Sequence, residues 1–202
     1  MGLACGPRCR RAADVAKAFI AGRRGITGVL EGAERDLLRK LFADIITMLE
    51  PDTPAHEDPL AALIGLDMDA TVPTDPALLR LLPDAVRNDA GAALEFRQLT
   101  ERSLRENKIG ALRAASLDLD HDKVVLDADR ARLWSMALND VRLVLAERLE
   151  IRDEQDADRV HLVQDWGEAD DVESYLSLVY NFVSWLQESL VQAMLVGLKS
   201  RK

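Results

Sequence analysis

The sequence predicts a mainly α-helical protein, an aliphatic helical bundle with one small β-hairpin near the N-terminus. Apolar residues make up 48% of the 202 residues and aromatic residues only 4%, so we expect a core of Leu, Val, Ile and Ala. Apolar side chains recur every three or four residues in several segments, which is the spacing of one helix face. Aspartates precede three of these segments, where their carboxylates can cap a helix.

The first elements are a short strand and a helix. Residues 24–30 contain Ile26, Val29 and two glycines, which favours a strand, and a turn over 22–25 would join it to the preceding residues as a hairpin. A helix over 14–21 is the alternative for that preceding segment. From Glu34 the apolar side chains follow a helical period as far as Leu49, and two prolines shortly afterwards end the helix.

The rest of the chain predicts four more helices and a strand. These are a short helix over 76–82, a long helix over 89–117, a strand over 123–126, and helices over 128–151 and 171–197, with an acidic loop between the last two. The last two helices carry apolar stripes with steps of three and four residues, so we expect them to pack together and to bury Leu138 and Val183. A homodimer seam is the alternative use of these stripes.

Charged residues are distributed unevenly along the chain. Residues 1–25 hold six basic side chains and one acid, whereas residues 150–173 hold ten acids and two bases. We therefore predict a basic, partly flexible arm over residues 1–24 and a helical domain over residues 25–198. The net charge of −9 disfavours a protein that binds nucleic acid through its whole surface. No apolar run could span a membrane and no secretory signal is recognisable, which predicts a cytoplasmic protein.

No catalytic, cofactor or metal motif stands out. The three histidines, His56, His121 and His161, fall in predicted loops and have no metal-ligand spacing. Phosphate-binding glycine loops and a nucleophile elbow are missing from the sequence. We therefore expect a protein that is not an enzyme and that has neither a cofactor nor a bound metal.

Two cysteines carry the most reactive chemistry. They stand in Cys5-Gly-Pro-Arg-Cys9, and the only disulfide that can form within one chain joins them. Arg8, Arg10 and Arg11 lie beside the thiols, and positive charge favours the thiolate, which is the form that reacts with oxidants. The residues alone leave two readings open: a redox-active pair, or two cysteines that happen to lie near the start of the chain.

One predicted helix has a polar interruption. Asn139, Asp140 and Arg142 stand among apolar residues of the helix over 128–151. A buried polar group has to find hydrogen-bond partners, so we expect this trio to be a structural tether from the helix to a neighbouring loop. An interaction site for another protein is the alternative.

Three stretches together carry a family resemblance. They are Asp75-Pro-Ala-Leu-Leu-Arg-Leu-Leu-Pro83, the segment 133–151 with Asn139-Asp140-x-Arg142 and Leu149-Glu-Ile151, and the segment 175–195 with Trp185-Leu-Gln-Glu-Ser-Leu190. In this order and spacing they resemble an actinobacterial family of small helical proteins, long a domain of unknown function, that includes the oxidative-stress regulator AosR. The resemblance covers roughly residues 25–195.

The resemblance implies a redox-responsive transcriptional regulator of the oxidative-stress response. The regulator described in that family acts through a CxxxC thiol pair and a stress sigma factor, and the spacing of Cys5 and Cys9 matches that pair. Oxidation would then join the two thiols, reshape the basic arm and change the affinity for the sigma factor. Two alternatives are an interaction adaptor in which the thiols are incidental and a direct DNA-binding regulator that uses the basic arm.

Overall fold

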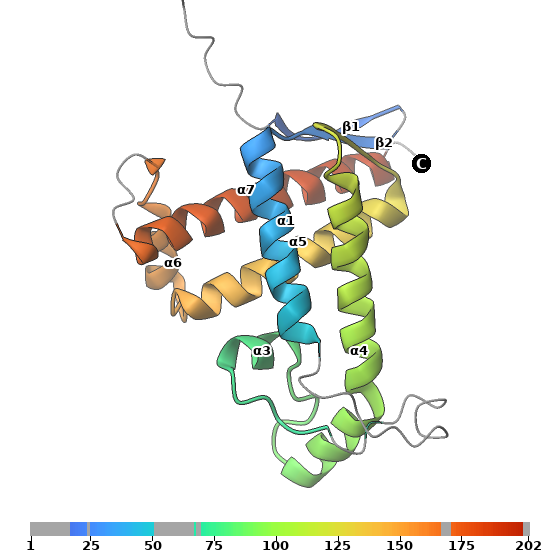
Figure 1. Ribbon diagram of the computed structural model, residues 1–202, viewed down its shortest axis with the longest axis vertical. Coiled ribbons are helices and arrows are strands. Elements are labelled where there is room, and N and C mark those ends of the chain that lie inside the picture. Colours follow the sequence, from blue (N-terminus) through green and yellow to red (C-terminus); the bar gives the residue numbers. More distant parts are fainter. Residues whose placement is uncertain (1–16, 24, 51–66, 68–69, 167–170, 200–202) are drawn as a thin grey trace, which may run out of the picture.

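A small sheet lies at one end of two crossed layers of helices. The computed structural model describes residues 17–23, 25–50, 67, 70–166 and 171–199. Helices α1 (Gly32–Leu49) and α4 (Ala90–Asp118) run along the long axis, and α5 (Ala128–Arg148) and α7 (Val172–Lys199) cross them (Figure 1). The mainly helical fold class predicted from the sequence is confirmed. No helix in the described ranges has the length and apolarity that a membrane crossing requires.

The sheet contains the predicted hairpin and one strand from the middle of the chain. Strands β1 (Lys17–Gly22), β2 (Gly25–Val29) and β3 (Lys123–Leu126) pair antiparallel in the order β1-β2-β3. Gly25 closes the hairpin with φ of 123°, and a Cβ there would lie 2.4 Å from the Leu126 carbonyl oxygen, so this position requires glycine. Strand β1 lies within the predicted arm over residues 1–24 and pairs with β2 in the sheet.

Side-chain caps begin most of the helices. Asp75 caps α3 (Pro76–Leu81), Asp89 caps α4 and Asp127 caps α5, each carboxylate accepting a backbone N–H from the first turn. At α1, Glu31 and Glu34 form a reciprocal capping box. The order of these elements agrees with the sequence prediction.

The end of one predicted helix was wrong, and one helix was not predicted. Helix α5 ends at Arg148 rather than Ile151, because Glu150 takes a left-handed conformation with φ of 54° that a continuing helix cannot contain. The predicted acidic loop contains a helix, α6 (Glu154–His161), capped by Asp153. Only Val160 of α6 is fully buried, so the segment has too little apolar periodicity to be recognised as a helix.

An aromatic group lies at the centre of an otherwise aliphatic core. The side chain of Trp134 on α5 is completely buried, and the rings of Phe19 on β1 and Phe42 on α1 meet it edge-on at centroid distances of 5.5 and 6.1 Å. The Trp134 indole N–H donates to Asp118 at the end of α4 over 2.9 Å. One side chain of α5 therefore contacts the sheet and two other helices, α1 and α4.

The predicted pairing of α5 with α7 is confirmed. The two helices pack against each other, and Leu138 and Val183 have no exposed surface. The apolar stripes of both helices supply much of the core, which also contains residues of the sheet, α1, α3 and α4. The steps of three and four residues thus identified core positions correctly.

Replacing Leu138 with Ala should lower the free energy of unfolding by about 2–5 kcal/mol, because the substitution leaves a cavity in a fully packed site. Urea unfolding monitored by circular dichroism measures this change. Leu117→Ala is the matched control, since that side chain is 67% exposed on α4 and should change the free energy by less than about 0.5 kcal/mol. Equal effects of the two substitutions would contradict the assignment of the core.

Candidate functional site

The predicted redox site adjoins a strand that is anchored in the fold. Cys5, Cys9 and the arginines Arg8, Arg10 and Arg11 lie outside the described residues. Cys9 stands eight positions before Lys17, where β1 begins. The structure therefore describes the strand that follows the cysteine-containing segment in the sequence.

Phe19 fixes β1 to two helices. Its backbone N–H donates to the Ser189 hydroxyl of α7 over 3.1 Å, and its ring packs on Trp134 of α5. A Cβ at Gly28 would lie 2.8 Å from the Phe19 ring, so the neighbouring strand needs glycine to admit this ring. A displacement of the chain before β1 would therefore be transmitted to α7 through the Phe19 backbone and to α5 through the Phe19 ring.

The structure separates the predicted polar trio of α5. Asp140 is buried, and its carboxylate accepts from the Lys108 ammonium of α4 over 2.6 Å. Burial raises the pKa of Asp140, and the hydrogen bond from Lys108 opposes that rise. Asn139 is exposed on another side of the helix.

Arg142 connects α5 to α7. Its guanidinium donates to the Gln187 side-chain oxygen over 2.7 Å and lies 5.9 Å from the centre of the Tyr180 ring. The Gln187 amide in turn donates to the backbone oxygen of Ser135 over 3.3 Å. We predicted a tether to a loop, whereas the partners of Asp140 and Arg142 lie on the helices α4 and α7.

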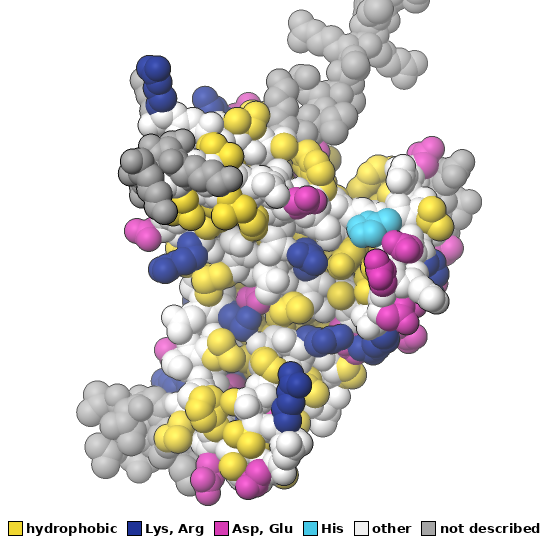
Figure 2. Space-filling model, turned by 180° about the vertical axis from the view of Figure 1, so that it is seen from behind, with side chains coloured by type: hydrophobic (Ala, Val, Ile, Leu, Met, Phe, Trp, Pro, Cys, Tyr) yellow, Lys and Arg dark blue, Asp and Glu magenta, His cyan; other side chains and the backbone are white. Residues whose placement is uncertain are grey.

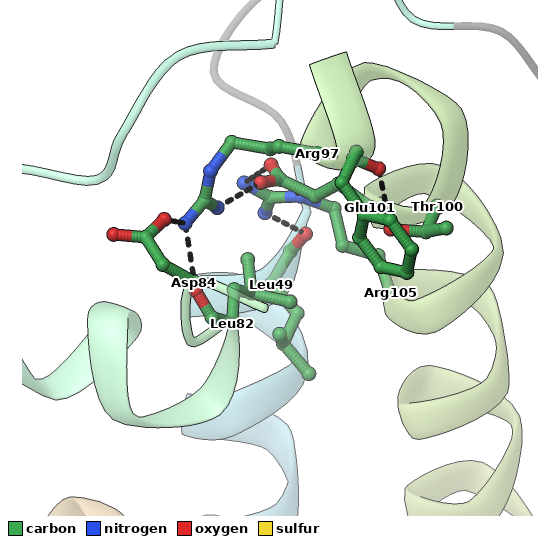
Figure 3. A network of polar contacts seen from close by, with 8 residues as sticks. Leu49, Leu82, Asp84, Arg97, Thr100, Glu101 and Arg105 are labelled. Carbon is green, nitrogen blue, oxygen red and sulfur yellow. Dashed lines mark hydrogen bonds and ion pairs between the residues drawn. The ribbon is translucent and has the colours of Figure 1, made fainter. Parts of the chain in front are cut away.

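A network of ion pairs on α4 was missed from the sequence. Arg97 bonds to Asp84, to the Leu82 carbonyl that ends α3 and to Glu101, and Arg105 binds Glu101 and the Leu49 carbonyl at the end of α1 (Figure 3). The two guanidinium groups thus satisfy carbonyl groups at the C-terminal ends of two helices, where positive charge is favoured. Four charges cancel, which makes this network structural.

The spacing of the network was visible in the sequence. Arg97, Glu101 and Arg105 are four residues apart in succession, which places them on one face of a helix. That signal is common on exposed helices, and burial is what distinguishes this case: the Arg97 and Glu101 side chains are 4% and 5% exposed. A hollow of about 210 Å³, lined in part by Pro83, Phe96 and Leu104, lies beside them.

Glu147 joins α5 to α3 and to the segment before α6. Its carboxylate accepts from Arg152 over two 2.7 Å bonds and from Arg80 of α3 over 2.9 Å. These bonds lower the pKa of Glu147 to about 2. The carboxylate is therefore ionised at neutral pH, and it serves as a fixed acceptor.

A hollow larger than the one beside Arg97 lies where α7 ends. It has a volume of about 780 Å³ between the hairpin turn, the start of α5 and the last turns of α7. Apolar side chains such as Ile26, Met194 and Leu198 line it, and Arg23 and Arg132 lie at its edge. Asp127 and Asp129 line it as well, so the lining is apolar with two acids and two bases.

The charged side chains around Asp140, Glu147 and Arg97 pair with one another. Within the described ranges, no three His, Cys, Asp or Glu side chains are grouped so that they could hold a metal ion. A family model described as a domain of unknown function, DUF2017, matches residues 16–194. The chain belongs to the DUF2017 family. No curated protein and no solved structure matches the chain significantly.

The DUF2017 match covers the folded body from the beginning of β1 through most of α7. It includes Asp140, Arg142 and the Arg97 network, and it begins after both cysteines. Family membership therefore applies to the folded domain that contains β1. The thiol pair lies outside the segment that the family model matches.

Removing one partner of the Lys108–Asp140 pair should destabilise the domain strongly. Asp140→Ala leaves the Lys108 ammonium, 15% exposed, without its carboxylate, and should lower the free energy of unfolding by about 3 kcal/mol. The double substitution Lys108→Met with Asp140→Leu should cost less than the single one. Glu50→Ala, which breaks the exposed pair with Arg113, is the control and should cost below about 1 kcal/mol in urea unfolding.

Glu147 should make a pH-dependent contribution to stability. Its pKa is lower in the folded protein, so the stabilisation is complete above about pH 4.5 and is lost as the pH falls towards about 2. Glu147→Gln should therefore lower stability by about 1 kcal/mol at pH 7, since both arginines are partly solvated, and by progressively less below pH 4.5. Urea unfolding at several pH values checks this. A difference that stays constant down to pH 3, or that Glu95→Gln reproduces, would contradict it.

Proposed function

We propose that this DUF2017 protein is a redox-responsive, non-enzymatic regulator that acts in the cytoplasm by binding another protein. By resemblance, that partner is a stress sigma factor and the process is transcription under oxidative stress. Hydrogen peroxide oxidises the two thiols: Cys5 and Cys9 lose two hydrogens and form a disulfide, and the peroxide is reduced to two water molecules. The flanking arginines favour the thiolate that begins this reaction.

The single observation that supports the proposal is the anchoring of β1. The arm that bears the thiols leads into a strand whose Phe19 is hydrogen-bonded to Ser189 and packed on Trp134. A disulfide between Cys5 and Cys9 shortens and stiffens the arm within eight positions of that strand. Because β1 is held in place, we expect a change in the arm to alter the surface that a partner contacts beside α7.

An adaptor without redox control is the second candidate. The observation in its favour is that α7 exposes several large apolar side chains, among them Tyr175, Trp185 and Leu195, on a surface that needs no thiol. Such an adaptor would bind its partner equally well in reducing and oxidising conditions. A homodimer through α7 is a third use of the same side chains.

Mild peroxide should convert the reduced full chain to a monomer that is lighter by two hydrogens and has no thiol left to alkylate, and a reductant should reverse this. Binding to the stress sigma factor of the same organism, measured by calorimetry, should change several-fold between the two states. The double variant, Cys5→Ser with Cys9→Ser, should bind the sigma factor equally well before and after peroxide treatment. The thermal midpoint should move little, because the loop that the disulfide closes contains few residues and constrains the unfolded chain only weakly.

Three results would contradict the redox proposal. They are sulfinic acid as the main product, a disulfide between two chains, and equal sigma-factor binding by reduced and oxidised protein. The last result, together with unchanged binding by the double serine variant, would establish the adaptor instead. Light scattering of the reduced protein at tens of micromolar concentration reports any homodimer.

A further inference from the structure

Two stripes of side chains lie side by side along the contact between α5 and α7. On α5, Arg132, Ser135, Asn139 and Arg142 follow one another at steps of three, four and three residues, so they share one face of the helix. On α7 the second stripe steps by three, four, four and three residues; its members are Ser184, Gln187, Val191, Leu195 and Leu198. We call these nine residues, of which Gln187 is buried at the contact with α5, the α5–α7 face.

Direct contacts place the two stripes on the same surface. Near one end, Gln187 accepts from Arg142 over 2.7 Å and donates to the Ser135 carbonyl over 3.3 Å. At the other end, Arg132 and Leu198 both line the 780 Å³ hollow. The stripes consequently run antiparallel, and Arg132 and Arg142, ten positions apart, are separated by about 15 Å along the helix.

The α7 side of this face is apolar and open. The exposed fractions of Val191, Leu195 and Leu198 are 37, 47 and 63%, and they increase towards the hollow. The space-filling view shows hydrophobic side chains gathered around the C-terminal end of α7 with basic side chains next to them (Figure 2). Apolar surface that adjoins a hollow is typical of a site that receives side chains of another molecule.

The α5 side supplies positive charge that the described residues do not neutralise. Arg132, Arg142 and Arg23 at the edge of the hollow take part in no ion pair within the described ranges. Arg142 is held by the neutral groups of Gln187 and Tyr180, and its Nε is buried without a hydrogen-bond acceptor. A guanidinium that neutral neighbours hold in place can donate hydrogen bonds to a carboxylate with little further ordering of its side chain.

Acidic side chains at the border define how a ligand can lie. Asp127 is occupied as the cap of α5, where it accepts the Arg130 N–H over 2.8 Å. Both Asp127 and Asp129 line the hollow, which therefore favours the apolar groups of a ligand over its acids. Asp129 and Glu188 are exposed and would repel ligand acids placed next to them. The acidic groups of a ligand are therefore favoured beside Arg132 and Arg142, and the apolar groups of the ligand are favoured beside α7.

We propose that the α5–α7 face binds an amphipathic α-helix of a protein partner whose apolar stripe is bordered by Asp or Glu. The apolar side chains would cover Val191, Leu195 and Leu198 and enter the hollow, and the acids would meet Arg132 and Arg142. A helix of roughly ten to fourteen residues spans the face at 1.5 Å per residue. The inference rests on the proposed function in taking a protein as the ligand, but it does not depend on the thiols.

Two synthetic fourteen-residue peptides test the proposal with the reduced full chain. Both carry Leu at positions 3, 7, 10 and 14 on an alanine-rich helix, one with Glu and the other with Lys at the bordering positions. Fluorescence anisotropy at low salt should show micromolar binding of the Glu peptide and at least about tenfold weaker binding of the Lys peptide. Raised salt should weaken the Glu peptide because the arginine contacts are exposed.

Matched substitutions locate the binding. Arg132→Glu should weaken the Glu peptide about tenfold, whereas Arg87→Glu, an exposed arginine before α4, should change it less than about twofold. Leu195→Ser should weaken it about fivefold, whereas Leu117→Ser on α4 should have little effect. All four side chains are exposed, and circular dichroism should confirm that each variant folds.

Several outcomes would overturn the proposal. They are equal binding of both peptides, equal effects of the site and control substitutions, no binding at millimolar peptide, and a dimer in light scattering that Arg132→Glu dissociates. The last result would assign the face to a second copy of the chain. Cys5→Ser with Cys9→Ser should bind the Glu peptide like the original chain, so failure of the redox proposal would not be confused with failure of this one.

Discussion

The burial of one indole ring is the constraint on which the arrangement of the domain depends. Trp134 meets Phe19 and Phe42 edge-on and donates its N–H to Asp118, so the sheet, α1, α4 and α5 converge on it. Asp118 also pairs with Arg130 over 3.1 Å, which keeps the acceptor in place. A buried indole needs such an acceptor. The end of α4, the start of α5 and the position of β1 are therefore set together.

Charged groups hold the helices at positions away from the indole. The Lys108–Asp140 pair joins α4 to α5, Glu147 joins α5 to α3, and the Arg97 network joins α4 to the ends of α1 and α3. The Lys108–Asp140 pair and the Arg97 network balance their own charge, and the two arginines at Glu147 share one carboxylate. The arginines of the α5–α7 face differ in that they have only neutral partners or none among the described residues, and this difference is what marks the face as a binding surface.

Local chemistry explains what the sequence revealed. Periodic apolar residues, capping aspartates and the glycines around the hairpin predicted the helices of the core and the first two strands, because each signal acts within a few residues. The sequence did not reveal that β3 joins that hairpin, because strand pairing across nearly one hundred positions leaves no local pattern. Helix α6 was missed because its single buried residue, Val160, cannot establish a period.

The candidate site was predicted less completely than the fold. Asn139, Asp140 and Arg142 were recognised as unusual, but their partners, Lys108 and Gln187, are 32 and 45 positions away and could not be inferred from spacing. The predicted direction of the tether was wrong for the same reason. The thiols are a chemical signal in the sequence itself, and they lie outside the described residues.

The coverage of β1 by α7 also bears on how this sheet behaves in a concentrated solution. A sheet edge with a free row of backbone donors and acceptors can recruit strands from other chains and grow into aggregates. At the β1 edge, Ser189 occupies the Phe19 amide and a register shift between Lys17 and Ile20 interrupts the regular ladder. The opposite edge belongs to β3, which has only four residues and begins with Lys123. The domain thus carries a sheet that resists strand recruitment on both sides.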